Sequence, residues 1–212
     1  MPNAPPTTFP IFPLPTVVLV PGALLPLHIF EPRYREMLAD ALAGNRHIGM
    51  AMPHPPRSDE DAARPRVERI VGLGRIAHHR PYPDGRSDVL LEGVARMRIV
   101  REVPTDRLYR TVVAIEVPDV LPDEGDIPAS ALALLLADGG IAAEDHAALA
   151  ALPPGRLADV LLLRLPVDAR EKHRIHANPR VVERVHEVAR ALARLAGSSY
   201  PPEIGPGDPR RN

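Results

Sequence analysis

Residues 9–44 read FPIFPLPTVVLVPGALLPLHIFEPRYREMLADALAG, which is a set of short apolar runs followed by one amphipathic segment. The apolar runs cover residues 9–14, 17–20 and 24–30. Pro21-Gly22 makes a turn before the last of them. Short apolar runs that are separated by proline and glycine predict two or three short strands.

The amphipathic segment predicts a helix over residues 31–43. From Tyr34 onward, apolar residues recur three and four positions apart, which places them on one helical face. Pro32 suits the first turn, and Gly44 is a C-terminal stop signal. Glu31 puts a carboxylate at the positive end of the helix.

The β pattern continues beyond this helix. Further strands are expected at residues 47–52, 67–79, 87–92, 95–103 and 109–117. Pro83-Asp84-Gly85 supplies turn chemistry, so residues 76–92 are expected to form a hairpin. Gly72 and Gly74 lie inside a strand pattern, which indicates a bulge or a close approach of another backbone. Residues 53–66, PHPPRSDEDAARPR, have no periodicity and predict a mobile loop.

The composition changes at residues 119–128, and helical periodicity follows. Helices are expected at residues 130–138, 144–152, 156–165, 169–176 and 179–196. The fold class is therefore α+β, with a mostly antiparallel sheet or partly closed barrel and one inserted helix ahead of a helical bundle. The expected parts are a disordered leader (1–8), a β domain (9–118), a linker (119–128), the bundle (129–197) and a disordered tail (198–212).

Composition removes several classes of function. The 212 residues carry a formal net charge of −1, which argues against a dedicated polyanion binder. The chain has no cysteine, so disulfides, thiolate zinc sites and cysteine nucleophiles are excluded. No apolar run approaches the roughly 18 residues that a membrane span needs. The N-terminus lacks the pattern of a signal peptide, and a soluble cytoplasmic protein is expected.

The sequence shows no catalytic constellation. It contains no phosphate-binding loop, and none of its serines lies in a G-x-S-x-G motif. The segment starting at His186 resembles an H-E-x-x-H zinc helix, but arginine stands at the second ligand position. His173 and His176 are expected to be solvated surface histidines. We therefore expect no catalytic residue, no metal and no cofactor.

A basic segment needs separate consideration. From Arg64 to Arg110 the chain has eleven arginines against six acidic residues. Arg96, Arg98 and Arg101 nearly share one face of a half-exposed strand. A solvated sheet face of mixed charge is favoured over a nucleic-acid platform, because stacking aromatics are scarce there.

Three stretches together resemble one known family. These stretches are FPLPTVVLVPGALLPLHIFEPRYREMLADAL (12–42), VGLGRIAHHRPYPDGRSDVLLEGVARMRI (71–99) and ADVLLLRLPVDAREKHRIHANPRVVERVHEV (158–188). They are similar to the N-terminal substrate-binding domain of Lon proteases over residues 9–196. Ile175 and His176 stand where leucine and glutamate are more usual. The resemblance implies a PUA-like β pseudo-barrel followed by a helical bundle, and a role in recognising polypeptides.

A Lon protease continues into an ATPase and a protease domain, and this chain ends before either. The expectation is therefore a stand-alone, non-catalytic module that binds unfolded or degradation-marked polypeptide as an adaptor or holdase. A separate Lon-type protease is a candidate partner. Phe30, Glu31, Arg33 and Tyr34 are the candidate binding residues; the competing interpretation is that Glu31 and Arg33 cap the helix while Phe30 and Tyr34 are core.

The alternative function is RNA binding through the surface from Arg64 to Arg110, since PUA-like folds elsewhere hold RNA. Nucleic acid is the less favoured partner, and no membrane partner is expected. An unrecognised hydrolase is the third possibility.

Overall fold

The computed structural model describes residues 5–56, 64–123, 125–127, 129–138 and 146–197. The chain forms two units, Met1–Pro118 with Val167–Pro179 and Asp119–Pro166 with Arg180–Asn212. The expected disordered tail and the first half of the expected leader lie outside the described residues, as does the middle of the expected loop. Thr7 and Thr8, assigned above to the leader, pair with Ala114 and Val113 in the first strand.

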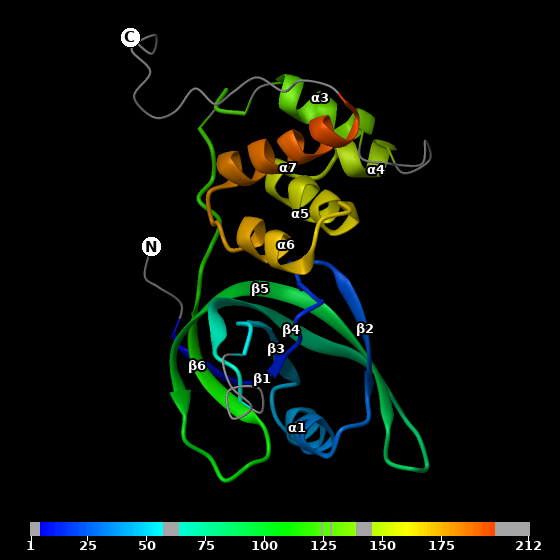
Figure 1. The fold of residues 1–212 in the computed structure, drawn as a ribbon, viewed down its shortest axis with the longest axis vertical. Helices are drawn as coiled ribbons and strands as arrows, with labels where there is room; N and C mark the ends of the chain where they lie inside the picture. Colours follow the sequence, from blue (N-terminus) through cyan, green and yellow to red (C-terminus); the bar gives the residue numbers. More distant parts are fainter. Residues whose placement is uncertain (1–4, 57–63, 124, 128, 139–145, 198–212) are drawn as a thin grey trace. The chain divides into compact units, whose positions relative to one another are not determined.

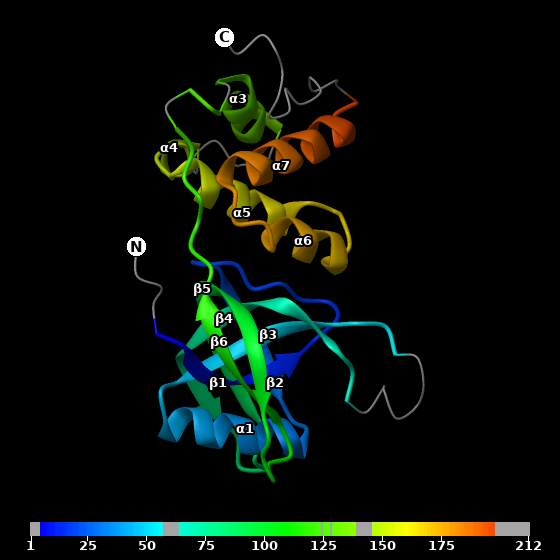
Figure 2. The same ribbon diagram turned by 90° about the vertical axis from the view of Figure 1, so that its left-hand side faces the viewer.

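The first unit is built on six strands (Figures 1 and 2). They are β1 (Thr7–Pro13), β2 (Leu24–Ile29), β3 (His47–Pro53), β4 (Val67–Pro81), β5 (Ser87–Val103) and β6 (Arg110–Glu116). Their order is β2-β5-β4-β3-β1-β6, and β5 also pairs with β6. That extra pairing closes β1, β3, β4, β5 and β6 into a barrel, with β2 added beside β5. All pairs are antiparallel except β1 with β3, so the predicted fold class is confirmed.

Strand β5 is longer than expected, because the segments 87–92 and 95–103 form one strand of 17 residues. Leu73 pairs with Ala95 while Gly74 pairs with Gly93, so Val94 is the extra residue of a β-bulge. A bulge exchanges the faces to which the following side chains point. The bulge therefore lets one strand serve two different cores.

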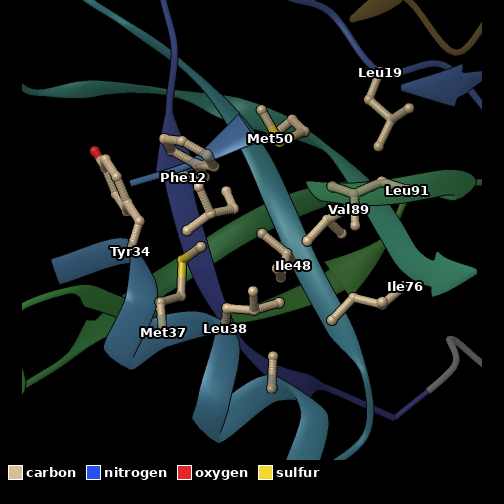
Figure 3. Packing of buried hydrophobic residues seen from close by; sticks show 12 residues of the cluster. Phe12, Leu19, Tyr34, Met37, Leu38, Ile48, Met50, Ile76, Val89 and Leu91 are labelled. Atoms are coloured by element: carbon tan, nitrogen blue, oxygen red, sulfur yellow. The ribbon is translucent and has the colours of Figure 1, made fainter. Parts of the chain in front are cut away.

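Those two cores lie on opposite faces of the strands. Phe9, Ile11, Val71, Leu73, Met97 and Val112 belong to the cluster enclosed by the barrel. The second cluster includes Phe12, Leu19, Ile48, Met50, Ile76 and Leu91, and helix α1 (Pro32–Ala43) packs on it through Tyr34, Met37 and Leu38 (Figure 3). The helix begins at Pro32 and ends before Gly44, as predicted.

Of the two or three short strands predicted in residues 9–30, two form, as β1 and β2; the apolar run 17–20 has no strand pairing, although Leu19 and Val20 are buried. It crosses β4 and β5 where these carry glycine. A Cβ at Gly72 would lie 2.0 Å from the Leu19 carbonyl oxygen, and one at Gly93 would lie 2.1 Å from that of Val20. The close approach expected at Gly72 is thus confirmed.

Helix α6 (Ala169–His176) belongs to the first unit, although the sequence placed it within the bundle of residues 129–197. Asp168 caps it as predicted, accepting a 2.8 Å hydrogen bond from the Glu171 amide. His173 and His176 were expected on the surface, but both are buried. His173 Nε2 contacts the Ile70 carbonyl of β4 at 2.9 Å. The helix is so short that its pattern of apolar and polar residues could not show that its two histidines would be buried.

The second unit contains α3 (Ala129–Asp138), α4 (His146–Ala150), α5 (Pro154–Arg164) and α7 (Val181–Leu195). The apolar stripe of α7 is buried as its spacing predicted, including Val185, Val188 and Leu192. Arg184 is buried in the same stripe, and its guanidinium donates two 2.9 Å hydrogen bonds to Asp119. This ion pair ties the first residue of the unit to its last helix.

Candidate functional site

A groove with a cavity volume of about 510 Å³ opens in the first unit beside the start of α1. It lies at the ends of β1 and β3, along the chain that enters β4 and the connection from β5 to β6. Its walls carry six prolines: Pro13, Pro15, Pro53, Pro55, Pro56 and Pro65. Because proline has an apolar ring, no N–H and a fixed φ, these positions add apolar surface on a backbone with little conformational freedom.

Residues 53–56 and 64–65, the two ends of the predicted loop 53–66, form part of this lining. Residues 57–63 lie outside the described residues. The two ends are joined to each other by the His54 amide, which donates to the Arg66 carbonyl at 2.7 Å. The loop ends are therefore a built part of the groove.

Five arginines also line the groove, and each has a carboxylate partner. The pairs are Arg33–Glu31, Arg64–Glu102, Arg110–Glu102, Arg107–Glu36 and Arg170–Glu68. Asp40 adds a second carboxylate at 3.4 Å from Arg107. Five guanidinium groups thus face five carboxylates, and the arginines do not make this groove a strong anion site.

Tyr109 anchors the wall formed by the β5–β6 connection. Its hydroxyl donates a 2.7 Å hydrogen bond to Asp40 of α1. Burial, together with this bond to a carboxylate, raises the pKa of Tyr109 to about 12. Next to it, Leu108 is 65% exposed, and its backbone amide is held at 3.1 Å by Glu36. An apolar side chain on a fixed backbone is thus presented at the groove.

The four residues proposed from the sequence divide between different places. Arg33 and Tyr34 line the groove. Tyr34 is also core: its ring centroid lies 3.9 Å from that of Phe12, and the Arg33 guanidinium carbon lies 4.5 Å from the centroid of the Tyr34 ring. Glu31 precedes the helix without capping it through its side chain, and it accepts a 2.9 Å bond from Arg33.

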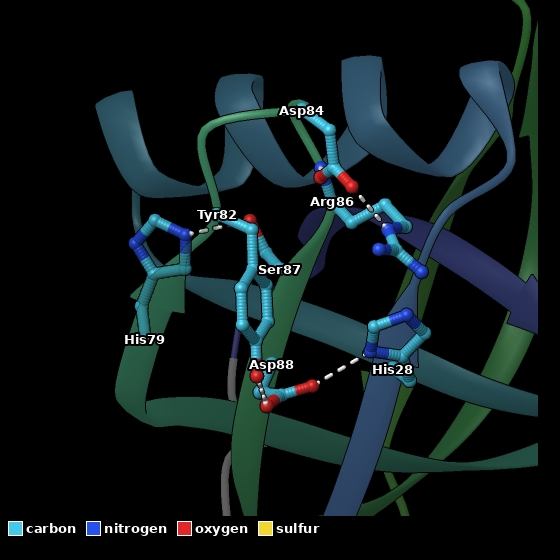
Figure 4. A network of polar contacts seen from close by, with 7 residues as sticks. All are labelled: His28, His79, Tyr82, Asp84, Arg86, Ser87 and Asp88. Atoms are coloured by element: carbon cyan, nitrogen blue, oxygen red, sulfur yellow. Dashed lines mark hydrogen bonds and ion pairs between the residues drawn. The ribbon is translucent and has the colours of Figure 1, made fainter.

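Phe30 is not part of the groove lining. It is 58% exposed just after β2, with its ring centroid 6.2 Å from that of His28. His28 in turn contacts Asp88 at 2.7 Å, and Tyr82 donates its hydroxyl proton to the same carboxylate (Figure 4). The hydrogen bond from His28 is the main reason that the pKa of Asp88 lies below its ordinary value.

The same region places His79 Nε2 3.1 Å from Ser87 Oγ (Figure 4). A histidine beside a serine is the start of a nucleophilic site, which needs a third group to orient the histidine. In the part of the chain that the structure describes, no carboxylate bonds to His79, and the serine is buried. The pair therefore reads as a cross-strand contact between β4 and β5.

The arginine row predicted on β5 is only partly a surface. Arg98 and Arg101 are exposed, but Arg96 is buried and donates a 2.6 Å hydrogen bond to the carbonyl of His176. Among the described residues, no cluster of three or more histidines or carboxylates has metal-binding geometry. None of the described helices is long and apolar enough to span a bilayer.

Most of the groove was missed by sequence reasoning, which selected residues at the start of α1 and overlooked Leu108 and Tyr109. The available signal was the concentration of prolines at the ends of β1 and β3. Turn-forming prolines in two separate loops do not reveal that the loops meet, because their meeting depends on the parallel pairing of β1 with β3.

Comparison with known proteins assigns the family. The family model of the ATP-dependent protease La (LON) substrate-binding domain matches residues 8–194. This chain belongs to the Lon substrate-binding domain family. A Lon protease from Flavobacterium johnsoniae is 33% identical over 121 residues, covering 57% of this chain and 15% of that protease. One from Dictyoglomus thermophilum is 27% identical over 197 residues, covering 89% of this chain and 24% of that protease. The chain thus spans a quarter or less of these two Lon proteases.

Solved Lon N-terminal structures have the same fold. The N-terminal domain of the Mycobacterium avium complex Lon protease superposes with a TM-score of 0.67 at 17% identity, covering 88% of this chain and 98% of that one. A Lon N-terminal domain protein from Xanthomonas campestris gives 0.65 at 21% identity, covering 91% and 99%. The predicted membership in the Lon family is confirmed.

Proposed function

We propose that this protein is a non-catalytic module that binds unfolded or degradation-marked polypeptide in the proline-walled groove. The observation that carries the proposal is the combination of a proline-rich apolar lining with arginines that all have carboxylate partners, Arg64 and Arg110 sharing Glu102. Such a groove gains affinity mainly from apolar burial, at about 25 cal/mol per Å². Membership in a family named for substrate binding supports the same conclusion.

The proposed role is that of an adaptor or holdase in the cytoplasm, with a separate Lon-type protease as one partner. Exposed apolar segments distinguish an unfolded chain from a folded one. A groove that recognises apolar side chains together with an extended backbone would therefore select unfolded chains without reading one sequence. Arg33 and Tyr34 are proposed to contact the bound chain, and Glu31 to hold Arg33 in place. Phe30 is proposed as a second contact outside the groove.

Fluorescence anisotropy with a labelled, permanently unfolded polypeptide tests the proposal. The informative variant is Leu108→Ser, and Leu24→Ser is its matched control, because Leu24 is 63% exposed and lies on β2 outside the groove. Loss of an apolar contact worth about 1 kcal/mol should weaken binding about fivefold in Leu108→Ser alone.

A structured RNA titrated in parallel tests the alternative function. We expect saturable binding of the polypeptide with little dependence on salt, and no comparable RNA binding. RNA binding that falls steeply with salt would contradict the proposal. Equal weakening by the two leucine variants would move the binding site away from the groove.

A further inference from the structure

The outer face of β5 differs in its electrostatics from the groove. Register places Ile70, Arg98 and Ile115 side by side on β4, β5 and β6, and Arg101 beside Val113. Val112 and Ala114 point into the barrel, so their neighbours Val113 and Ile115 point outward. These side chains form a mixed aliphatic and basic surface, which we call the β5 face.

A bulge brings an additional apolar residue to this face. Ile99 pairs with Ala114 while Arg101 pairs with Val113, so Val100 is the unpaired residue between them. Val100 is 58% exposed, with Arg98 two positions before it and Arg101 directly after it. Bulges commonly re-aim a side chain at functional positions, and this bulge directs an apolar side chain into solvent.

The two arginines of the β5 face are not neutralised. In the described part of the chain, neither Arg98 nor Arg101 takes part in an ion pair or a side-chain hydrogen bond, whereas all five groove arginines have carboxylate partners. Their positive potential is therefore available to a partner. Arginine interspersed with aliphatic side chains is typical of the centre of a protein interface.

The geometry points to an acidic amphipathic helix of another protein as the occupant of the β5 face. Strand β5 is paired with β4 on one side and with β6 along this segment on the other, so no strand can be added at an edge. A partner must lie across the face, and a helix with one apolar stripe does so. Carboxylates flanking that stripe would meet Arg98 and Arg101, while the stripe covers Val100 and Val113.

Peptide binding to the full chain tests this inference. The probe is a short fluorescein-labelled helical peptide with leucines on one face and glutamates beside them, and its twin has lysine in place of glutamate. We expect saturable, salt-sensitive binding of the acidic peptide only, weakened at least about tenfold in the double variant Arg98→Glu/Arg101→Glu and also weakened in Val100→Asn.

The matched control is Arg35→Glu/Arg80→Glu, which changes the net charge equally at exposed arginines away from the β5 face. Equal weakening by the two double variants would reduce the effect to overall charge and overturn the inference. Absence of acidic-peptide binding would overturn it too. RNA binding that depends on Arg98 and Arg101 would assign the face to nucleic acid instead. Binding of unfolded polypeptide in the groove is a separate readout, so either proposal can fail alone.

Discussion

A Cβ atom placed on Gly72 would stand 2.0 Å from the carbonyl oxygen of Leu19. Strand β4 therefore depends on glycine at a position where another segment of backbone crosses it. Gly93 on β5 has the same relation to Val20, and its amide and carbonyl both bond to the crossing segment, through Ala23 and Gly22. The crossing segment closes the core on which α1 packs.

We predict that Gly72→Ala lowers the free energy of unfolding by about 3 kcal/mol, because overpacking against a backbone atom cannot be relieved by a rotamer change. His78→Ala is the control, since His78 is exposed on the same strand. Urea denaturation followed by circular dichroism measures both. Equal stability of Gly72→Ala and wild type would mean that the crossing segment moves away at little cost.

Arg184 should be essential for the stability of the second unit. Its buried guanidinium lies between Asp119 and Asp159, and its Nε is 3.2 Å from the latter. Removing one member of a buried ion pair costs about 3–5 kcal/mol, because the other charge stays buried. Arg184→Leu should therefore unfold at much lower denaturant concentration than wild type.

Arg180→Leu is the control for that change, since the Arg180–Glu183 pair is mostly exposed and such pairs contribute at most about 1 kcal/mol. The triple variant Arg184→Leu/Asp119→Leu/Asp159→Leu should recover part of the loss. Similar denaturation midpoints for Arg184→Leu and Arg180→Leu would show that the buried charges are not what holds the unit together.

From the raised pKa of Tyr109 we predict that the protein loses stability at alkaline pH. Because burial, and after it the bond to Asp40, raise the pKa of Tyr109 in the folded protein to about 12 from an ordinary value of 10, folding favours the neutral phenol, and this contribution to stability is fully present below pH 10. That contribution is lost as the pH rises from 10 to 12. Ultraviolet absorbance of the phenolate, compared with Tyr109→Phe, should show this tyrosine ionising near pH 12. Asp40→Asn should lower that pKa; an unchanged pKa would contradict the contribution assigned to Asp40 and leave burial as the whole cause.

From the lowered pKa of Asp88 we predict a loss of stability in acid. Its pKa is lowered chiefly by the hydrogen bond from His28, its register partner on β2. The stabilisation of β2 is therefore present above the ordinary carboxyl pKa of 3.8 and is lost as the pH falls through the lower folded value. Carboxyl titration by NMR should give a pKa below 3.8 in wild type and a higher one in His28→Ala. Identical values would assign the shift to Tyr82 instead.

Local sequence patterns predicted the elements whose causes are local. The helix from Pro32, the turn at Gly85 and the cap at Asp168 follow from turn and capping chemistry within a few residues. Local patterns failed where the cause of a segment's conformation lies far away in the chain. The run 17–20 has strand composition, but Gly72 and Gly93, more than fifty residues later, let it cross the sheet instead.

The candidate site follows the same rule. Tyr34 was predicted as either core or contact, and it packs on Phe12 while also lining the groove. Leu108 could not be selected from the sequence, because its exposure depends on Glu36 of α1 holding the backbone of a distant loop. The sequence showed Arg98 and Arg101 only as members of a basic segment. The structure separates them from other arginines of that segment, because those have partners: Glu102 for Arg64 and Arg110, and the His176 carbonyl for Arg96.

The most direct test of the central claim is amide chemical-shift mapping by NMR. The isotope-labelled protein would be titrated with an unlabelled, permanently unfolded polypeptide. We predict that the largest shifts fall on Arg33, Tyr34, Leu108 and Tyr109, with smaller shifts at Phe30, and that Leu24 of β2 and the residues of α7 change little. Largest shifts on β2 or α7, with the groove unchanged, would contradict polypeptide binding in the groove.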